Sequence, residues 1–296
     1  MKAGISVLFT TALAPAIWGS TYIVTTEYLR GFSPMTVALL RALPAGLLLL
    51  LLVRELPVGA WWIKVCVLGA LNFSLFLSML FIAAYRLPGG VAATLGATQP
   101  LLVVVLARLI LGRPLQLLSF VAALVGAAGV ALLVFTPGAV LDPVGVIAGL
   151  VGAGSMALGT VLNRKWQPPV SLLTFTAWQL TAGGLLLLPV VLVFEPPMPV
   201  PGIDNLLALG WLGLVGMGLA YVVWLRGIVR LDAALVSSLG LLSPLMAVLL
   251  GWIFLDQSLD GFQMAGALAI VASIGLIQHV SRGVAPPVQR LTAAGG

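Results

Sequence analysis

The chain has 296 residues, of which 61% are hydrophobic and only 7% are charged, with a formal net charge of +6. A water-soluble domain carries roughly a quarter charged residues, so this composition excludes a protein whose surface faces mainly water. The Lys and Arg residues are scattered singly along the chain, which argues against nucleic-acid binding and fits a membrane protein with basic cytoplasmic loops.

Apolar runs divided by Pro, Gly or polar breaks fill the chain. A membrane helix needs about 20 such residues, and ten runs of this kind can be counted. In chain order the predicted spans are 4–26, 33–53, 62–84, 89–111, 116–135, 143–163, 171–194, 204–225, 233–254 and 260–280. Barrel strands do not fit continuous apolar runs, and an open sheet would leave amides unpaired in lipid. The predicted fold class is therefore an all-α integral membrane protein with ten transmembrane helices.

The first run resembles a signal peptide in two respects. Lys2 precedes it, and Ala12-Leu13-Ala14 is similar to a cleavage site. The apolar stretch continues past that point to about Thr26, so we expect a retained first helix.

The basic residues predict the orientation. With the N-terminus in the cytoplasm, only Arg30 and Arg86 fall outside and Arg41 lies within a helix. The cytoplasmic side then holds Lys2, Arg54, Lys64, Arg108, Arg113, Arg164, Lys165, Arg226, Arg230, Arg282 and Arg290. We therefore predict a multi-pass protein of the cell inner (plasma) membrane with both termini in the cytoplasm.

The chain matches itself at two shifts. A shift of 144 residues aligns Arg86-Leu87 with Arg230-Leu231, Leu95-Gly96 with Leu239-Gly240, Pro100-Leu101 with Pro244-Leu245, and Leu115 with Leu259. A shift of 138 aligns Ser33 with Ser171, Thr36 with Thr174, and Gly46-Leu47 with Gly184-Leu185.

Five helices in each half is an odd number, so the second half enters the membrane from the opposite side. The sequence thus predicts two inverted five-helix repeats, 1–137 and 138–281, followed by a disordered cytoplasmic tail at 282–296. Inverted repeats of this kind are the architecture of secondary transporters, which enclose a solute site near the membrane midplane.

Several short motifs accompany this pattern. They are Trp18-Gly19-Ser20 in the first helix, Pro100 and Pro244 in the fourth and ninth, and the turns Leu111-Gly112-Arg113-Pro114-Leu115 and Leu255-Asp256-Gln257-Ser258-Leu259. With the ten helices in two repeats, they resemble the drug/metabolite transporter (DMT) superfamily, EamA-type, over nearly the whole chain. The chain looks most like its YddG-type exporters, whose relatives move aromatic amino acids and methionine outward. One departure is Arg113, where the family commonly has Glu.

Proline inside a helix leaves the carbonyl four residues earlier without its amide donor. For Pro100 and Pro244 these carbonyls belong to Gly96 and Gly240. We interpret the four residues as matching helix breaks or hinges that flank a substrate path. A kink that helps helices to pack is the alternative.

Arg41 is the only formal charge well inside a predicted helix. It could attract the carboxylate of an amino acid, and its repeat partner Gln179 could hydrogen-bond the same ligand. The alternatives are that Arg41 extends to the membrane surface or pairs with Glu27.

Amides and aromatic rings complete the candidate site. Asn72 and Gln99 are hard to satisfy within one helix and are predicted to line a cavity. The tryptophans near predicted helix ends read as interfacial anchors: Trp61, Trp62, Trp166 and Trp211. Deeper rings would suit a planar apolar substrate, although packing is the alternative for each. The predicted substrate-binding set is Trp18, Tyr22, Arg41, Asn72, Phe76, Gln99, Trp178, Gln179, Tyr221, Trp224 and Ser243.

Missing groups restrict the mechanism. The eight carboxylates fall at predicted helix ends or in loops, and His279 is at the end of the last helix. With no midplane proton relay, we expect facilitated diffusion or exchange. The single Cys66, the absence of a phosphate-binding loop and the lack of a nucleophile paired with a base predict no enzyme, metal or cofactor.

We therefore predict an exporter of small amino acids or related metabolites that works by alternating access as a monomer or weak homo-oligomer. The alternatives are an exporter of another small metabolite or drug, or a channel-like facilitator. The expected partners are the small-molecule substrate and the lipid bilayer.

Overall fold

The computed structural model describes residues 2–87, 89–113, 117–134, 142–254 and 260–283. All regular elements among these residues are helices. They are α1 (Lys2–Tyr28), α2 (Pro34–Val53), α3 (Trp61–Gly69), η1 (Ala70–Ser74), α4 (Leu75–Arg86), α5 (Gly89–Gly96), α6 (Gln99–Leu111), α7 (Leu117–Leu133), α8 (Pro143–Lys165), α9 (Leu172–Phe194), α10 (Ile203–Gly210), η2 (Trp211–Leu219), α11 (Ala220–Arg230), α12 (Ala233–Leu239), α13 (Leu242–Phe254) and α14 (Gly261–Gly283).

Within the described residues, nine helical segments are long and apolar enough to cross a membrane, and α7 is a shorter apolar helix. The prediction of an all-helical protein is therefore confirmed, and the segments follow the predicted spans closely. The largest difference is at α11, which continues to Arg230 instead of ending at 225. Arg226 and Arg230 lie in this added turn, where basic side chains stabilise the negative end of the helix dipole.

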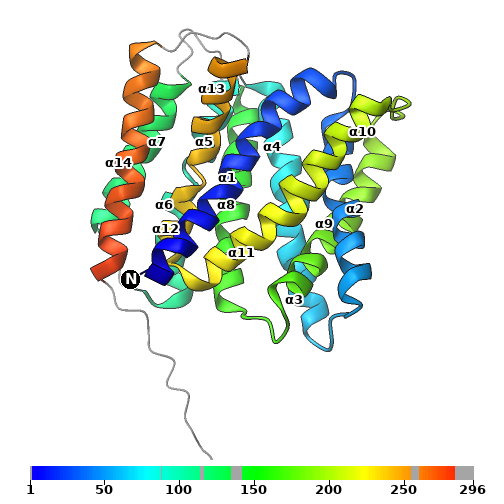
Figure 1. The fold of residues 1–296 in the computed structure, drawn as a ribbon, viewed down its shortest axis with the longest axis horizontal. Helices are drawn as coiled ribbons and strands as arrows, with labels where there is room; N and C mark the ends of the chain where they lie inside the picture. The colour runs from blue at the N-terminus through cyan, green and yellow to red at the C-terminus, as the bar shows by residue number, and fades with distance from the viewer. Residues whose placement is uncertain (1, 88, 114–116, 135–141, 255–259, 284–296) are drawn as a thin grey trace, which may run out of the picture.

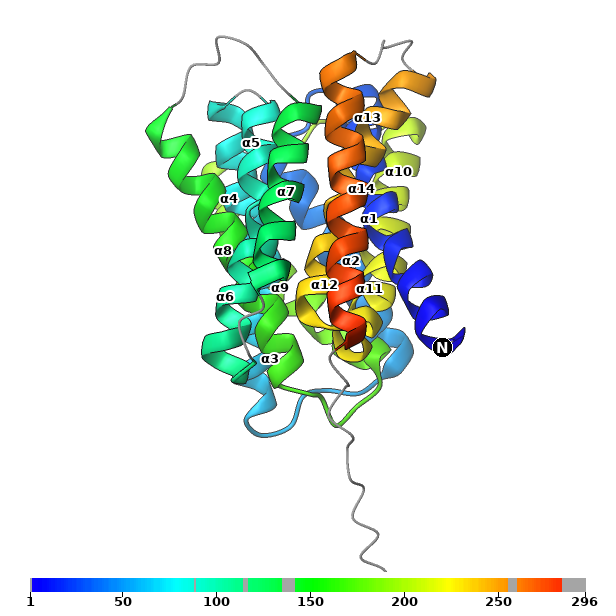
Figure 2. The same ribbon diagram turned by 90° about the vertical axis from the view of Figure 1, so that its left-hand side faces the viewer.

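The helices form one bundle (Figure 1). The start of α1 and the end of α14 lie at the same end of it, which we call the terminal end. The helix pieces α6 and α12 lie in the half nearer this end, and α5 and α13 lie in the other half (Figures 1 and 2). At the terminal end α6 packs against α12, whereas in the other half α5 packs against α8 and α13 packs against α1.

Helices α2 and α9 pack closely through two glycines. A Cβ atom at Gly46 would lie 2.5 Å from the backbone N of Thr181, and one at Gly184 would lie 2.6 Å from the Cβ of Leu43. The 138-residue shift takes Gly46 to Gly184 and Leu43 to Thr181, so the second contact repeats the first with the two helices exchanged. Such reciprocal contacts are what a two-fold relation between antiparallel helices produces.

A second glycine pair joins α7 to α14. A Cβ atom at Gly129 would lie 2.9 Å from the carbonyl oxygen of Gly266, and one at Gly266 would lie 2.5 Å from the carbonyl oxygen of Gly129. Small residues let backbones approach in this way, and Ser273 Oγ adds a 2.6 Å hydrogen bond to the Ala122 carbonyl. In each pair, one helix comes from residues 1–137 and the other from 138–281.

Two membrane-spanning helices contain a π-helical stretch. In the first, η1 separates α3 from α4, and in the second, η2 separates α10 from α11. The 144-residue shift carries 70–74 to 214–218, which lies inside η2. Because π-turns inside α-helices are rare and occur often at functional sites, their matching positions direct attention to the region between them.

Candidate functional site

Helix α1 contacts η2 through two side chains of the Trp18-Gly19-Ser20 motif. Trp18 Nε1 donates a 2.7 Å hydrogen bond to the carbonyl of Gly216, and Trp211 Nε1 donates a 3.0 Å bond to Ser20 Oγ. A π-turn leaves carbonyls out of the regular helical ladder, so an indole donor can reach one of them. The motif therefore fixes the orientation of α1 against η2.

Gly19 brings the same helix against α13. A Cβ atom there would lie 2.6 Å from the Cβ of Met246 and 2.8 Å from the carbonyl oxygen of Ser243. Only a residue without a side chain allows this approach. The predicted site residue Ser243 thus lies where α1 crosses the start of α13, one position before Pro244.

Four aromatic side chains from three helical segments meet next to this crossing, and we call them the aromatic cluster: Trp18, Phe73, Tyr221 and Trp224. The ring of Trp18 lies 5.1 Å from that of Trp224 and 6.3 Å from that of Tyr221, and Phe73 lies 4.6 Å from Tyr221 between centroids. Phe73 belongs to η1 and was not predicted as a site residue. The predicted Phe76 is half-buried and packs against the same core.

Three polar groups at this location have no hydrogen-bond partner among the described residues. They are the hydroxyl of Tyr221, Nε1 of Trp224 and Oγ of Ser237, and each side chain is at most 2% exposed. A Cβ atom at Gly240 would lie 4.0 Å from the Trp224 ring and 3.0 Å from the Ser237 carbonyl, so α12 ends beside the cluster. Buried polar groups are normally paired, so each such group needs a reason.

The two membrane-spanning helices that contain Pro100 and Pro244 are each interrupted near the proline. Helix α12 ends at Leu239 and α13 begins at Leu242, while α5 ends at Gly96 and α6 begins at Gln99. The expectation for the Gly240 carbonyl needs correction, because this oxygen accepts a 3.0 Å hydrogen bond from the Ser243 amide. Tightening to three-residue spacing supplies a donor in place of the one that Pro244 lacks.

Arg41 is the only charged side chain among the described residues that is fully buried, at 6% exposure. Its Nη2 lies 3.5 Å from Thr21 Oγ1 on α1, and its backbone faces Gly213 of η2. Glu27, the expected alternative partner, instead forms an ion pair with Arg30 at 3.2 Å. Arg41 therefore places a positive charge from α2 against α1, while its backbone packs against η2.

The predicted residues Asn72 and Gln179 belong to a separate amide network. Asn72 Nδ2 donates to Gln179 Oε1 at 2.9 Å, and Gln179 Nε2 donates to Asn163 Oδ1 at 3.1 Å. All three side chains are buried, and Gly159 leaves room for Asn72 against α8. The network joins η1, α9 and α8, and both ends of the Gln179 amide are occupied within it. The expectation that Gln179 shares a ligand with Arg41 stays a prediction, and the Gln179 amide is bonded to neighbouring side chains in this structure.

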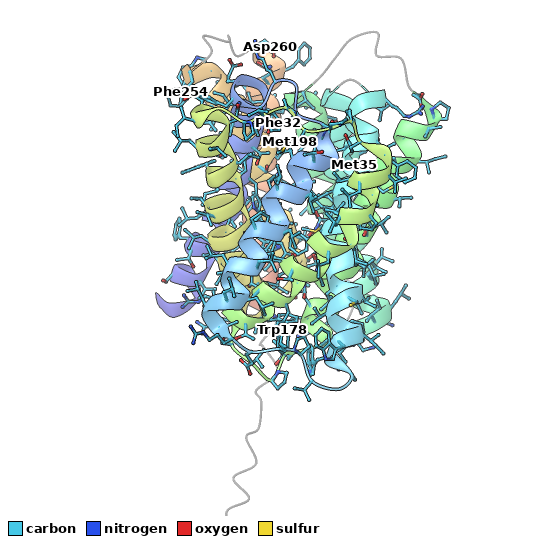
Figure 3. All side chains as sticks on the ribbon, turned by 90° about the vertical axis from the view of Figure 1, so that its right-hand side faces the viewer. Phe32, Met35, Trp178, Met198, Phe254 and Asp260 are labelled. Carbon is cyan, nitrogen blue, oxygen red and sulfur yellow. The ribbon has the colours of Figure 1, made fainter. Side chains whose placement is uncertain are left out.

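Trp178 does not join the aromatic cluster. Its Nε1 donates a 2.7 Å hydrogen bond to the carbonyl of Glu55, in the link after α2, and its ring lies 6.5 Å from Trp61. Figure 3 shows Trp178 near the terminal end, opposite Asp260. The sequence interpretation placed this ring too deep, because α9 begins only at Leu172 and Trp178 lies less than two turns from that end.

Two further predicted residues remain apart from these contacts. Gln99 is half-buried at the first position of α6, directly after the break. The side chain of Tyr22 lies outside the part of the chain that the structure describes in detail.

Arg164 caps the C-terminus of α11, which lies at the terminal end of the bundle. Its Nη1 donates to the carbonyls of Ile228, Val229 and Leu231 at 2.6 to 2.7 Å. A cation at this position satisfies carbonyls that a helix C-terminus leaves without donors. Sequence reasoning counted Arg164 only as a basic residue of the cytoplasmic side and missed this contact.

At the other end an ion pair joins the two halves. Arg86 Nη1 lies 3.3 Å from Asp142 Oδ2, at the start of α8. A hydrogen bond from the Gly145 amide is the main cause that lowers the pKa of Asp142 below its ordinary value of 3.8, and the Arg86 charge acts in the same direction. The other described carboxylates also lie at helix ends or in links: Glu27, Glu55, Glu195, Asp204, Asp232 and Asp260. Asp256 lies outside the described residues.

Comparison with known proteins agrees with this membrane bundle. A model of the EamA-like transporter family matches residues 5–135 and again 143–278. The chain is 45% identical to Protein PecM of Dickeya dadantii over 270 residues, which cover 90% of this chain and 91% of that protein. It is 30% identical over 266 residues to the uncharacterized inner membrane transporter YedA of Escherichia coli, covering 88% and 87%.

A solved crystal structure shares the fold. It aligns with a TM-score of 0.80 at 22% identity and covers 96% of this chain and 99% of its own. The fold and the matches define a multi-pass membrane protein of the transporter class. The chain belongs to the EamA-like transporter family. The expected superfamily is thereby confirmed, whereas the relatives' names give no substrate and a specific likeness to YddG-type exporters remains a prediction.

Proposed function

We propose that the chain is a secondary transporter that carries aromatic amino acids and methionine, or closely related metabolites, out of the cytoplasm by alternating access. The observation that carries this proposal is the aromatic cluster. It lies where α1, η1, α11 and the end of α12 meet, and it includes buried polar groups without partners. A site for a planar solute needs this combination of ring faces and a few polar groups.

The arrangement of the helices supports alternating access. The reciprocal glycine contacts and the matching π-helical stretches fit two inverted repeats, of which 1–137 and 138–281 are the two halves. In this conformation α6 packs against α12 at the terminal end, while α5 and α13 pack against other helices. We interpret this as a pathway that is closed at the terminal end and opens at the other end.

The energy source that we propose is the solute gradient. The described carboxylates lie at helix ends or in links, and Arg41 is the buried charge. A proton-driven carrier normally uses an acidic residue or His within the membrane. If both termini lie in the cytoplasm, as the basic residues predict, the open end faces outward, which is one of the two states of an alternating-access cycle.

Uptake into proteoliposomes tests the proposal. Labelled phenylalanine, methionine, a nucleoside and a polyamine are supplied with and without an imposed pH gradient. We expect saturable uptake of phenylalanine and methionine that the pH gradient does not drive. Trp18→Ala should abolish this uptake, while Trp252→Ala, on the exposed side of α13, should leave it unchanged. Transport of the nucleoside or polyamine alone would contradict the proposed substrate class.

A further inference from the structure

We infer that the aromatic cluster selects its ligand by hydrogen-bond acceptors and negative charge, so that an aryl carboxylate binds there without needing an amino group. The inference rests on the proposed function, because it takes the cluster to be the substrate site. It goes further in naming the part of the substrate that is recognised.

The unpartnered groups of the cluster, and that of Ser237 on the neighbouring helix α12, can all act as hydrogen-bond donors. The indole Nε1 of Trp224 can only donate, and the hydroxyls of Tyr221 and Ser237 each offer a proton. All three belong to side chains that are at most 2% exposed. A ligand that reaches Trp224 Nε1 must supply an acceptor, which a carboxylate does and an ammonium group does not, while the two hydroxyls can donate to the same carboxylate.

The positive charge of Arg41, near the cluster, also favours a ligand with a negative charge. The guanidinium Nη2 of Arg41 lies 3.5 Å from Thr21 Oγ1, and Thr21 follows Trp18 of the cluster by three residues, about one turn, on α1. The buried guanidinium attracts an anion and repels a cation, and its influence is strong at a site that excludes water. Among the described residues, the carboxylates lie at helix ends or in links and offer the cluster no counter-charge for an ammonium group.

Aromatic faces can bind ammonium groups, and this possibility has to be weighed. Here part of the ring surface is covered by neighbouring rings, because Trp18 meets Trp224 edge to face and Phe73 lies 4.6 Å from Tyr221. What the cluster offers to an entering ligand is therefore the remaining ring surface together with unpartnered donors and, among the described residues, no carboxylate. The class of ligand that fits is a planar ring bearing a carboxylate, which includes aromatic amino acids and also their deaminated acids.

Three compounds that share a phenyl ring test the contributions of the carboxylate and the ammonium group separately. Phenylalanine carries both groups, 3-phenylpropionate only the carboxylate, and phenethylamine only the ammonium. Binding of each to the full chain in lipid nanodiscs is measured by calorimetry. We expect 3-phenylpropionate to bind at least as tightly as phenylalanine, and phenethylamine to bind at least about ten-fold more weakly, the loss expected for one charged hydrogen bond.

Donor-deleting variants connect this preference to the cluster. Trp224→Phe and Tyr221→Phe each remove one donor and keep a ring, and we expect each to weaken 3-phenylpropionate binding about ten-fold. The matched controls are Trp252→Phe and Tyr28→Phe, whose side chains are about half exposed at 51% and 52%. Thermal unfolding of each variant checks that the bundle still forms.

The outcomes distinguish the inference from the proposed function. Phenethylamine binding as tightly as 3-phenylpropionate, or full binding by both donor-deleting variants, would overturn the inference even if phenylalanine is transported. Donor-dependent binding of 3-phenylpropionate without transport of phenylalanine would support the inference and contradict the proposed amino-acid export. Binding of none of the three compounds would overturn both.

Discussion

Two groups of buried polar side chains in this membrane protein have different consequences. Asn72, Gln179 and Asn163 bond to one another and join η1, α9 and α8. Tyr221, Trp224 and Ser237 instead keep donors without partners beside the aromatic cluster. We assign a structural role to the first group, because its side chains bond to one another although Asn72 Oδ1 and Asn163 Nδ2 have no partner among the described residues. We assign a binding role to the second group, in which the side-chain donors have no such bonds, because an unsatisfied buried donor costs about 1–3 kcal/mol unless something compensates for it.

The structural role of the amide network can be measured. Gln179→Ala leaves Asn72 Nδ2 and Asn163 Oδ1 without their partners, and we expect a loss of about 1–3 kcal/mol of stability for each stranded group. Thermal unfolding in detergent, followed by tryptophan fluorescence, reports the change. Gln167→Ala, in the exposed link after α8, is the control. Equal unfolding temperatures for the two variants would remove the network from the account of stability.

Because of Asp142, we expect the stability of the folded chain to depend on pH in the acidic range. Its pKa is lower in the folded chain than in the unfolded chain, mainly because of the Gly145 amide, with Arg86 contributing. The stabilisation is therefore fully present above the ordinary value of 3.8 and is lost as the pH falls through the lower folded value. Unfolding temperatures measured from pH 6 to pH 3 should fall more steeply for the natural chain than for Asp142→Asn. Parallel curves would contradict this assignment.

The sequence identified individual polar residues better than their partners. Arg41, Asn72 and Gln179 stand out because amides and charges are rare in apolar runs. Their partners depend on which helix faces meet, and periodicity along one helix does not contain that information. Asn163 was overlooked for a related reason, since it falls at the last position of a predicted span and yet lies buried against α9.

At the scale of helices, close glycine contacts hold the two halves together. The contact of Gly46 with Thr181 and that of Gly184 with Leu43 are related by the 138-residue shift. The shift was visible in the sequence, but it showed only that the halves are alike. That α2 packs against α9, the helix to which the 138-residue shift takes it, became evident only from the structure, because many pairings of the predicted helices satisfy the same apolar pattern.

Adding a methyl group at Gly46 tests the packing of α2 against α9. Gly46→Ala would place a Cβ atom 2.5 Å from the Thr181 amide, and we expect it to separate α2 from α9 and cost about 1–3 kcal/mol. Gly154→Ala is the matched control, because a Cβ atom there meets nothing within 4 Å. If Gly46→Ala unfolds at the same temperature as Gly154→Ala, the close contact does not stabilise the bundle.

The helix interruptions were only partly predictable. Pro100 and Pro244 identified the positions at which the fourth and ninth helices are divided, because proline cannot donate to the helical ladder. The π-helical stretches η1 and η2 carry no comparable signal, since they consist of ordinary apolar and small residues. Their matching positions appear only when the structure is compared with the 144-residue shift.

Movement at the breaks leads to a kinetic prediction. Pro244→Ala restores an amide that can continue the helix from α12 into α13, and we expect a straighter, stiffer segment. Substrate binding should persist while the rate of exchange falls about ten-fold or more. Pro189→Ala, at an exposed position of α9, is the control. Unchanged exchange in Pro244→Ala would exclude this break from the transport cycle.

Across the whole molecule, alternating access requires a site that faces one side of the membrane at a time. The start of α1 and the end of α14 lie at one end of the bundle, where α6 also meets α12. Family membership and the helical fold agree with the sequence predictions. The identity of the substrate depends on which side chains meet in the site, and amino-acid composition does not contain that information. Alternating access is the claim on which the proposals about the site, the breaks and the energy source all depend.

Counterflow in proteoliposomes tests that claim most directly. Vesicles are loaded with unlabelled phenylalanine and diluted into buffer with a trace of labelled phenylalanine at constant pH. A carrier whose site alternates between the two sides predicts that the label accumulates transiently above its external concentration, because internal substrate drives the return of the loaded site. Label that only equilibrates, at a rate that internal phenylalanine does not change, would contradict the account and indicate a channel.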